Sequence, residues 1–219
     1  MGRIKALNCA GCGVFSCDQG LREKGPEWCP MHSQEEVYVE AFKEYQKPDI
    51  QTLALSAAKT EAAGYCKWTR VEEVMEFSKR AAFRRLGIAF CIGLRNEART
   101  CKRIFEANGF EVFSVVCKTG GRDKGEWGLS DEDKIEKGRE FEAACNPVAQ
   151  ALLLNEARTD LNVLVGLCVG HDSLFIKYSE APVTVLIAKD RVLAHNPVGA
   201  LYCARSYYEN KLIPSDKRR

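Results

Sequence analysis

The sequence has no long apolar run and no strong charge of either sign. No stretch of its 219 residues approaches the roughly 18 uninterrupted apolar residues of a membrane span, and no apolar segment follows the basic start MGRIKALNC. The formal net charge is only +2, with basic and acidic residues interleaved, so no broad electrostatic field points to nucleic acid. These absences predict a cytosolic protein that binds neither membranes nor nucleic acid.

The common sequence signatures of catalysis are also missing. The chain contains no Walker loop, no GxGxxG, no GxSxG and no HExxH motif, and it has no repeat of solenoid period. It does contain eleven cysteines. A cytosolic chain of this length can build a core without disulfides, so its clustered thiols are more often metal ligands or redox groups than bridges.

The pattern of the chain predicts three regions. Residues 1–33 are punctuated by Gly, Cys and Pro with almost no hydrophobic periodicity, and we expect a small Cys-rich, metal-binding head there. Residues 34–86 place apolar residues at spacings of three and four, which predicts a helical connector. Residues 87–219 are expected to form an α/β body that carries a site of cysteines at strand ends.

Two helices of the connector carry a capping signal at their starts. Ser33 and Thr69 each precede a helical segment and are followed three residues later by a carboxylate, Glu36 or Glu72. This spacing matches the capping box, in which the two residues satisfy each other's backbone N–H groups.

Short apolar runs alternate with helical segments in the body. The runs LGIAFCI and EVFSVVC flank the helical segment RNEARTCKRIFEANGF, and LNVLVGLC and APVTVLIAKD are two further strand candidates. The segment DKIEKGREFEAAC is expected to be helical, and Asn146-Pro147 begins another helix. We therefore expect an α/β fold of three layers, a mainly parallel sheet flanked by helices.

The first candidate metal site is the N-terminal cysteine set. The spacing Cys9-x2-Cys12-x4-Cys17-x11-Cys29 supplies four soft ligands in a segment too poor in apolar residues to fold alone. Tetrahedral thiolate coordination would order such a segment. Zinc is the first choice, an iron–sulfur cluster uses the same ligands, and His32 could replace one thiol. Free thiols in an unstructured leader are the remaining alternative.

The second candidate site collects four cysteines of the body. Cys91, Cys117 and Cys168 end predicted strands, and Cys145 precedes the helix at Asn146. The carboxyl ends of parallel strands lie along one edge of a sheet, where helix N-termini also point, so the four thiols could converge. Any one of them alone would be read as a small buried hydrophobic residue. Core packing or surface placement suffices for the remaining three cysteines of the chain, Cys66, Cys101 and Cys203.

Polar residues near these cysteines are candidates for catalysis or substrate binding. His171 could be a proton donor with Asp172 as its orienting partner, or the pair could simply begin the helix HDSLFIKY. Glu97 could act as an acid or base, or compensate a helix dipole. Lys118 could hold an anionic substrate. Further candidates of the same kind, each with an ordinary turn role as the alternative, are Lys189, Asp190, Arg191, His195 and the pair Gly120 and Gly121.

Several segments carry a resemblance to a known family. FCIGLRNEA, VVCKTGG, ACNPVAQALLLN, TDLNVLVGLCVGHDSLF and APVTVLIAKDRVLAHNP, together with the N-terminal cysteines, resemble the uncharacterised metal-binding family numbered 1847 among the domains of unknown function. The resemblance covers nearly the whole chain and is most specific from Thr159 to Pro197. It implies metal binding and assigns no reaction.

A weaker similarity of layout concerns the thiouracil desulfidase family, numbered 523 among such domains. In that family three cysteines hold a [4Fe-4S] cluster with one iron open to sulfur from a thiolated substrate, and the matching positions here are Cys91, Cys117 and Cys168. The chain departs from the pattern: Lys118 stands where that family has Pro-Glu, the glycine pair is closer, Cys145 is extra and no SPSCG motif occurs. The similarity is one of plan, so it suggests chemistry without assigning it.

Three functions follow as expectations. The first is an enzyme whose body site holds a [4Fe-4S] cluster for desulfuration or redox work on a thiolated or anionic small molecule, with zinc or a second cluster in the head. The second is a non-catalytic metal-handling or sensing protein with a structural zinc head. The third is a zinc-knuckle scaffold with inert body cysteines.

Overall fold

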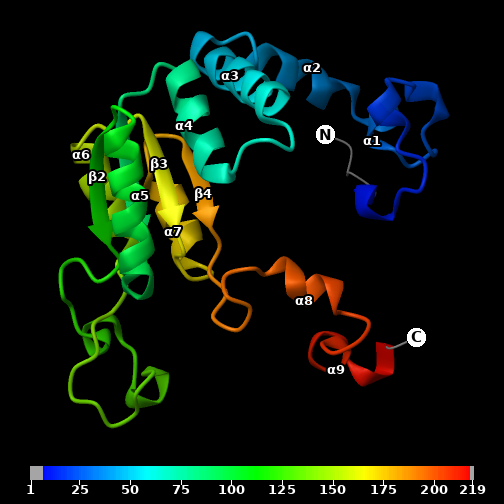
Figure 1. Cartoon of the computed structure of the whole chain (residues 1–219). Coiled ribbons are helices and arrows are strands. Elements are labelled where there is room, and N and C mark those ends of the chain that lie inside the picture. The colour runs from blue at the N-terminus through cyan, green and yellow to red at the C-terminus, as the bar shows by residue number, and fades with distance from the viewer. Residues whose placement is uncertain (1–6, 218–219) are drawn as a thin grey trace. The chain divides into compact units, whose positions relative to one another are not determined.

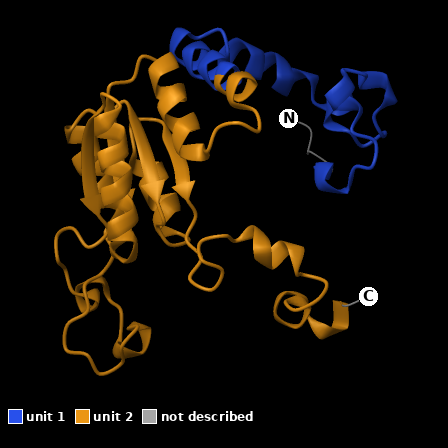
Figure 2. Cartoon of the chain, in the orientation of Figure 1, with its two compact units in different colours: residues 1–59 blue, residues 60–219 orange. Residues whose placement is uncertain are grey.

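The computed structural model describes residues 7–217, so the first six residues of the predicted head lie outside it. The chain divides into two compact units, residues 1–59 and residues 60–219 (Figure 2). The division falls within helix α3 (Pro48–Gly64). Each unit is described by itself below.

The first unit begins with short turns of helix around the N-terminal cysteines. These elements are short because the segment has few apolar residues to bury. Within residues 7–34, Ser16 is the only buried residue. The longer helix α2 (Glu35–Glu44) and the first part of α3 follow, as the spacing of apolar residues predicts. The short elements are η1 (Cys9–Gly11), η2 (Ser16–Gln19), η3 (Arg22–Lys24) and α1 (Pro30–Ser33).

One of the two predicted capping boxes is confirmed. Thr69 N donates to Glu72 Oε2 at 2.7 Å, and the Thr69 hydroxyl accepts from Glu72 N, at the start of α4 (Arg70–Arg80). The box predicted at Ser33 is wrong. Ser33 is the last residue of α1, and Gln34 precedes α2 without a side-chain cap, because the chain turns into a separate short helix just before α2 begins.

A sheet of four parallel strands forms the centre of the second unit, which confirms the α/β prediction. The strands lie in the order β2-β1-β3-β4. Every residue of β3 is buried, as expected for an apolar strand covered on both faces. The strands are β1 (Arg85–Phe90), β2 (Glu111–Val116), β3 (Leu161–Val165) and β4 (Val183–Ile187).

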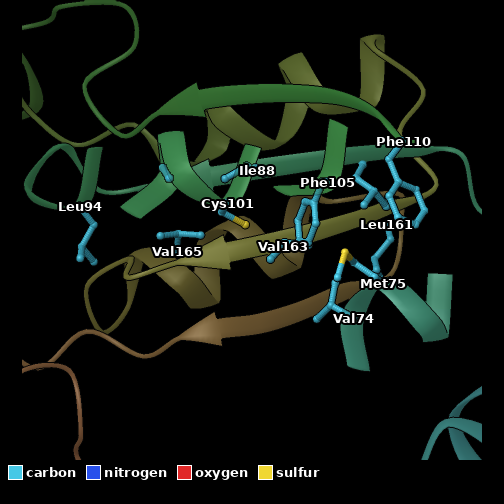
Figure 3. Packing of buried hydrophobic residues seen from close by; sticks show 12 residues of the cluster. Val74, Met75, Ile88, Leu94, Cys101, Phe105, Phe110, Leu161, Val163 and Val165 are labelled. Atoms are coloured by element: carbon cyan, nitrogen blue, oxygen red, sulfur yellow. The ribbon is translucent and has the colours of Figure 1, made fainter. Parts of the chain in front are cut away.

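Helices cover both faces of this sheet. On one face α5 (Arg95–Ala107) and α4 pack against β1 and β3, and Figure 3 shows Val74 and Met75 of α4 near Phe105 and Val163. Helix α4, predicted as part of the connector, therefore contributes to the core of the second unit. On the other face lie α6 (Pro147–Glu156) and α7 (His171–Tyr178), behind the sheet in Figure 1.

The loop between β2 and α6 differs from the prediction. The helix expected over DKIEKGREFEAAC is wrong: the loop contains the 3-10 turns η5 (Lys124–Trp127) and η6 (Asp131–Asp133) and no α-helix. Gly138 adopts a φ of 78°, and an isolated antiparallel bridge joins Asp123 to Ala143. The turn and the bridge fold the segment back on itself, so it does not form the predicted helix. We call residues 118–146 the excursion; it leaves the carboxyl ends of the strands (Figure 1).

Short elements end the described chain. These are η4 (Ile92–Leu94) between β1 and α5, and, after β4, α8 (Val198–Tyr202), α9 (Glu209–Leu212) and η7 (Ser215–Lys217). Over residues 7–217, none of the helices combines the length and the apolar character that crossing a membrane would require.

Candidate functional site: thiols at the strand ends

The parallel register places two cysteines side by side. Phe90 and Val116 are the last paired residues of β1 and β2, so Cys91 and Cys117 follow at the same level. Cys117 N donates to Phe90 O at 2.8 Å, and Cys91 N donates to Val165 O at 3.1 Å, which extends the ladder to both cysteines. Both residues are buried. The prediction that these two cysteines end strands is therefore confirmed.

The excursion returns to the same edge and brings Cys145 with it. Asn146 N donates to Cys117 O at 2.7 Å, and Lys118 Nζ donates to Ala143 O. The Asn146 side chain then caps α6 by accepting from Ala149 N at 3.0 Å, as predicted. Cys145 is thus fixed beside Cys117, although the whole excursion separates them in the sequence.

An ion pair at the base of the excursion supports this return. Lys124 Nζ lies 2.7 Å from Glu142 Oε1, and their side chains are only 15% and 10% exposed. Glu142 N also donates to Asp123 Oδ2 at 2.8 Å, and Glu142 Oε2 accepts from Ile135 N at 2.8 Å. The hydrogen bond from Lys124 lowers the pKa of the Glu142 carboxyl. We call these contacts of residues 122–124 with 142–144 the neck of the excursion.

Cys117 lies between two other thiols. Cys91 follows β1 at the level of Cys117, and Cys145 precedes Asn146, whose amide donates to Cys117 O. Ile92 N donates to Cys117 Sγ at 3.4 Å. The hydrogen bond from Cys117 lowers the pKa of Cys91 and, on the other side, that of Cys145. The same two contacts raise the pKa of Cys117, because its proton is shared with them. The contacts among the three thiols therefore favour the thiolate form of Cys91 and Cys145 over that of Cys117.

Cys168 stands apart from this chain. Strand β3 ends at Val165, and Gly166 (φ 66°) turns the backbone before Cys168 is reached, so this cysteine does not end its strand directly as Cys91 and Cys117 do. A Cβ atom at Gly166 would lie 1.9 Å from Leu94 Cδ1, so this approach requires glycine. Cys168 Sγ accepts a hydrogen bond from Arg191 Nη2 at 2.9 Å, and this contact raises the pKa of Arg191.

Cationic side chains surround the thiols. Lys189 is hydrogen-bonded to Cys91, and both Lys118 and His171 interact electrostatically with Cys145. Arg191 interacts electrostatically with Cys91 and Cys145 as well as with Cys168. Since one guanidinium is within electrostatic range of three of these cysteines, the four body thiols share one neighbourhood at the carboxyl edge of the sheet.

The candidate acid–base residues are placed differently from one another. Asp172 Oδ1 accepts from Gly170 N at 3.0 Å and from Ser173 N at 2.8 Å, at the start of α7, and within the described chain no hydrogen bond joins it to His171. Glu97 is exposed in the first turn of α5, and its side chain has no hydrogen bond or ion pair within residues 7–217. Lys118 and His171 are the two of the four candidates that interact electrostatically with Cys145, while Asp172 N donates to Cys168 O at 3.1 Å.

The turn after β4 is shaped by its own polar groups. Asp190 Oδ1 accepts from Val192 N at 2.9 Å and from Leu193 N at 2.8 Å, and His195 Nδ1 accepts from Asp190 N at 3.1 Å. This leaves Lys189 and Arg191 directed to the thiols while the nearby carboxylate is occupied by backbone. Gly120 and Gly121 both have positive φ, at 88° and 57°.

The head thiols have a more open setting. Cys9 and Cys17 are exposed, Cys12 and Cys29 are half-buried, and Phe15 N donates to Cys12 Sγ at 3.4 Å. His32 Nε2 is 3.2 Å from Gly25 O. In the chain without metal, no group of three or more His, Cys, Asp and Glu side chains within residues 7–217 has an arrangement that would hold an ion. The metal sites expected in the head and in the body therefore both remain predictions.

Sequence reasoning missed the neck of the excursion. Lys124 and Glu142 lie in a polar segment that was expected to be loop and helix, so nothing in their pattern predicted that they pair. The one signal was Asp123, which accepts from Gly125 N at 2.7 Å and marks a turn at the point where the neck begins.

Comparison with known proteins gives two matches. A family model with the description "Protein of unknown function (DUF1847)" matches residues 29–186. This range contains Cys29 and the four body thiols and leaves Cys9, Cys12 and Cys17 outside. An uncharacterised protein of Methanocaldococcus jannaschii is 48% identical over 207 residues, which cover 94% of this chain and 98% of that protein.

Proposed function

The chain belongs to the DUF1847 family of proteins of unknown function, and for this cysteine-rich member we propose a [4Fe-4S] cluster at the strand-end thiols that serves chemistry on a small molecule. The substrate class that we propose is a thiolated or anionic small molecule, and the reaction class is desulfuration or redox. The free state of all eleven cysteines suits this role and a cytosolic location.

One observation carries the proposal. Three cysteines from separate segments, Cys91, Cys117 and Cys145, lie next to one another at the edge where parallel sheets bind ligands. Cysteine in a core is normally isolated and inert, as Cys101 is: burial raises its pKa to about 12. Lowered pKa values at Cys91 and Cys145 favour the thiolate form that metal ligation needs.

The donor set, three neighbouring cysteines with cationic side chains around them, has the chemistry that a thiolate-bound cluster needs. The thiolates of a cluster bind different iron atoms, so they need not surround one point as ligands of one ion do. Ile92 N already donates to a site sulfur, and backbone N–H groups of this kind tune cluster sulfurs. Gln150 Oε1, on a side chain whose amide nitrogen donates to Val115 O and Phe90 O beside the thiols, is buried without a partner.

The bound cluster would supply a Lewis-acidic or redox iron centre. The chain's own contribution would be electrostatic. Lys118, Lys189 and Arg191 would balance the negative charge of several thiolates and attract an anionic substrate to the same edge. His171, near Cys145, would be placed to give or take a proton.

For the head we propose a structural zinc ion held by its four cysteines, with a second iron–sulfur cluster as the other ligand-compatible choice. The amide that donates to Cys12 Sγ supports a ligand role for this sulfur. A non-catalytic protein that handles or senses metal is the alternative function of the body site, and exchangeable metal would distinguish it.

The test is metal and acid-labile sulfide analysis on anaerobically prepared protein, with Cys117→Ala as the variant and Cys101→Ala as the control for loss of a buried thiol. We expect a brown protein with matching iron and sulfide, lost in Cys117→Ala and kept in Cys101→Ala. A colourless, iron-free sample after anaerobic reconstitution would contradict the proposal. Exchangeable zinc at the body thiols without sulfide would instead support metal handling.

A further inference from the structure

We infer that the four body thiols divide into three plus one: Cys91, Cys117 and Cys145 hold the cofactor, while Cys168, paired with Arg191, faces the substrate and receives its anionic group. This inference rests on the proposed function and sharpens it, because it assigns one thiol to the substrate and names the substrate's charge. The resemblance to the desulfidase family implies a different set, with Cys168 as a ligand and Cys145 as an extra residue.

The division follows from the contacts of the sulfur atoms. The strand register places Cys91 beside Cys117, and Asn146 N donates to Cys117 O at 2.7 Å next to Cys145, so these three cysteines are neighbours. The bond from Arg191 Nη2 occupies Cys168 Sγ at 2.9 Å. The partner of Cys168 is therefore a cationic side chain, whereas Cys117 Sγ accepts from a backbone amide.

The backbone separates the two sets in the same way. Cys91 and Cys117 directly continue the ladders of β1 and β2, and the neck fixes Cys145 against them. Gly166 instead turns the chain away from β3 at a φ of 66°, and its close approach to Leu94 holds that turn in place. Cys168 and the exposed Val169 and Gly170 then lie beyond the sheet, on the way to α7.

The turn after β4 gives this outer position its charge. Arg191 is exposed, whereas the carboxylate of Asp190 accepts from two amides of its own turn. Lys189, directed to Cys91, adds a second cation on the same turn. An anion that approaches from solvent would therefore meet Arg191 first. It would bind the guanidinium by a bidentate contact and replace Cys168 Sγ as the acceptor, which would leave this sulfur exposed to the substrate.

The first arm of the test compares two single variants of otherwise identical anaerobic protein. Cys145→Ala should lose iron and sulfide to the same extent as Cys117→Ala. Cys168→Ala should keep both near the wild-type content, with the cluster absorption intact. Loss in Cys168→Ala together with retention in Cys145→Ala would overturn the inference in favour of the set that the resemblance implies.

The second arm needs no cofactor. Metal-free protein is alkylated with iodoacetate, an anion, or with iodoacetamide, its neutral counterpart, and labelling at Cys168 is followed by peptide mass spectrometry. Because Arg191 attracts the anion, the iodoacetate-to-iodoacetamide rate ratio at Cys168 should exceed the ratio at Cys203 by about fivefold. Arg191→Met should abolish this excess, and Arg122→Met, at an exposed arginine of the excursion, should keep it.

The two arms separate the possible failures. If wild-type protein takes up no iron, the proposed function fails, and the labelling ratio still decides whether Cys168 and Arg191 receive an anion. If iron is bound but the ratio at Cys168 equals that at Cys203, or Arg191→Met leaves it unchanged, the substrate assignment is overturned while the cluster stands.

Discussion

The two sets of thiols reach their positions by opposite means. In the head, Cys9, Cys12, Cys17 and Cys29 are close in sequence, lie on or beside short turns and are exposed or half-buried. In the body, the hydrogen-bonded cysteines come from three distant segments and are held together by a sheet and a neck. Cysteines that are close in sequence are expected to come together only when metal binds. Cysteines at the ends of parallel strands are brought together by the folding of the sheet, before any metal binds.

The largest difference should appear when metal is removed. With a chelator present, the head has almost nothing buried to hold it, whereas structural zinc in comparable small sites contributes about 10 kcal/mol to folding. We expect backbone amides of residues 9–33 to lose their protection from hydrogen exchange while those of β1 and β3 keep it. Equal protection of the head with and without metal would remove the contrast between the two sets.

Gly166→Ala should disrupt the turn after β3 that leads to Cys168. The new methyl group would collide with the buried Leu94 side chain in a left-handed backbone, and we expect a loss of roughly 2 to 4 kcal/mol in the free energy of unfolding measured with urea. The matched control is Gly121→Ala, also at positive φ but with nothing within 4 Å of its Cβ, which should cost only about 1 kcal/mol. Equal losses would show that the approach to Leu94 has no role.

The neck can be opened by acid or by substitution. The pKa of Glu142 is lowered in the folded protein, so its ion pair with Lys124 stabilises the neck above the ordinary carboxyl pKa and is lost as the pH falls through the lowered value. Glu142→Gln should remove this support at every pH and increase the alkylation rate of Cys145 at pH 7 severalfold. Glu132→Gln, which breaks an exposed pair with Lys137 away from the neck, should change nothing. An unchanged rate in Glu142→Gln would show that the neck does not position Cys145.

The smallest expected effect is on stability, and it comes from substitutions at the start of one helix in each unit. Thr69→Ala removes a capping box and should lower the free energy of unfolding by about 1 kcal/mol. Ser33→Ala removes a hydroxyl that caps nothing and should change stability by less than about 0.5 kcal/mol in the same urea titration. A comparable loss at Ser33 would show that the sequence signal identified a real cap there.

Much of the body could be predicted because its signals are local and repeated. Alternating apolar runs and helical segments indicate a parallel sheet, and a cysteine at the end of a run is then placed at one edge with its neighbours. This reasoning located Cys91 and Cys117 correctly, and the Asn146-Pro147 helix start indicated where Cys145 would return. The capping pattern likewise predicted Thr69.

The parts that could not be predicted depend on pairings between distant polar residues. Lys124 with Glu142, and Arg191 with Cys168, have no periodicity that would link them, and only the folded chain brings them together. Residues 133–145 of the excursion do not form the helix expected there. The bridge between Asp123 and Ala143 and the turn at Gly138 replace it, and neither feature leaves a periodic pattern in the sequence. The capping box predicted at Ser33 was wrong for a related reason, because Ser33 is the last residue of a short helix that the sequence pattern did not predict.

The closed neck also makes the tip of the excursion separable from the thiols. Residues 125–141 begin and end at the ion pair of Lys124 with Glu142, and residues 133–136 also bond to that pair. Changes elsewhere in the tip should therefore have little influence on where Cys117 and Cys145 meet. Relatives can therefore vary this tip without moving the thiols, and an engineer can shorten it or insert a fluorescent reporter there. Such a graft would give this family a readout of its own thiol chemistry.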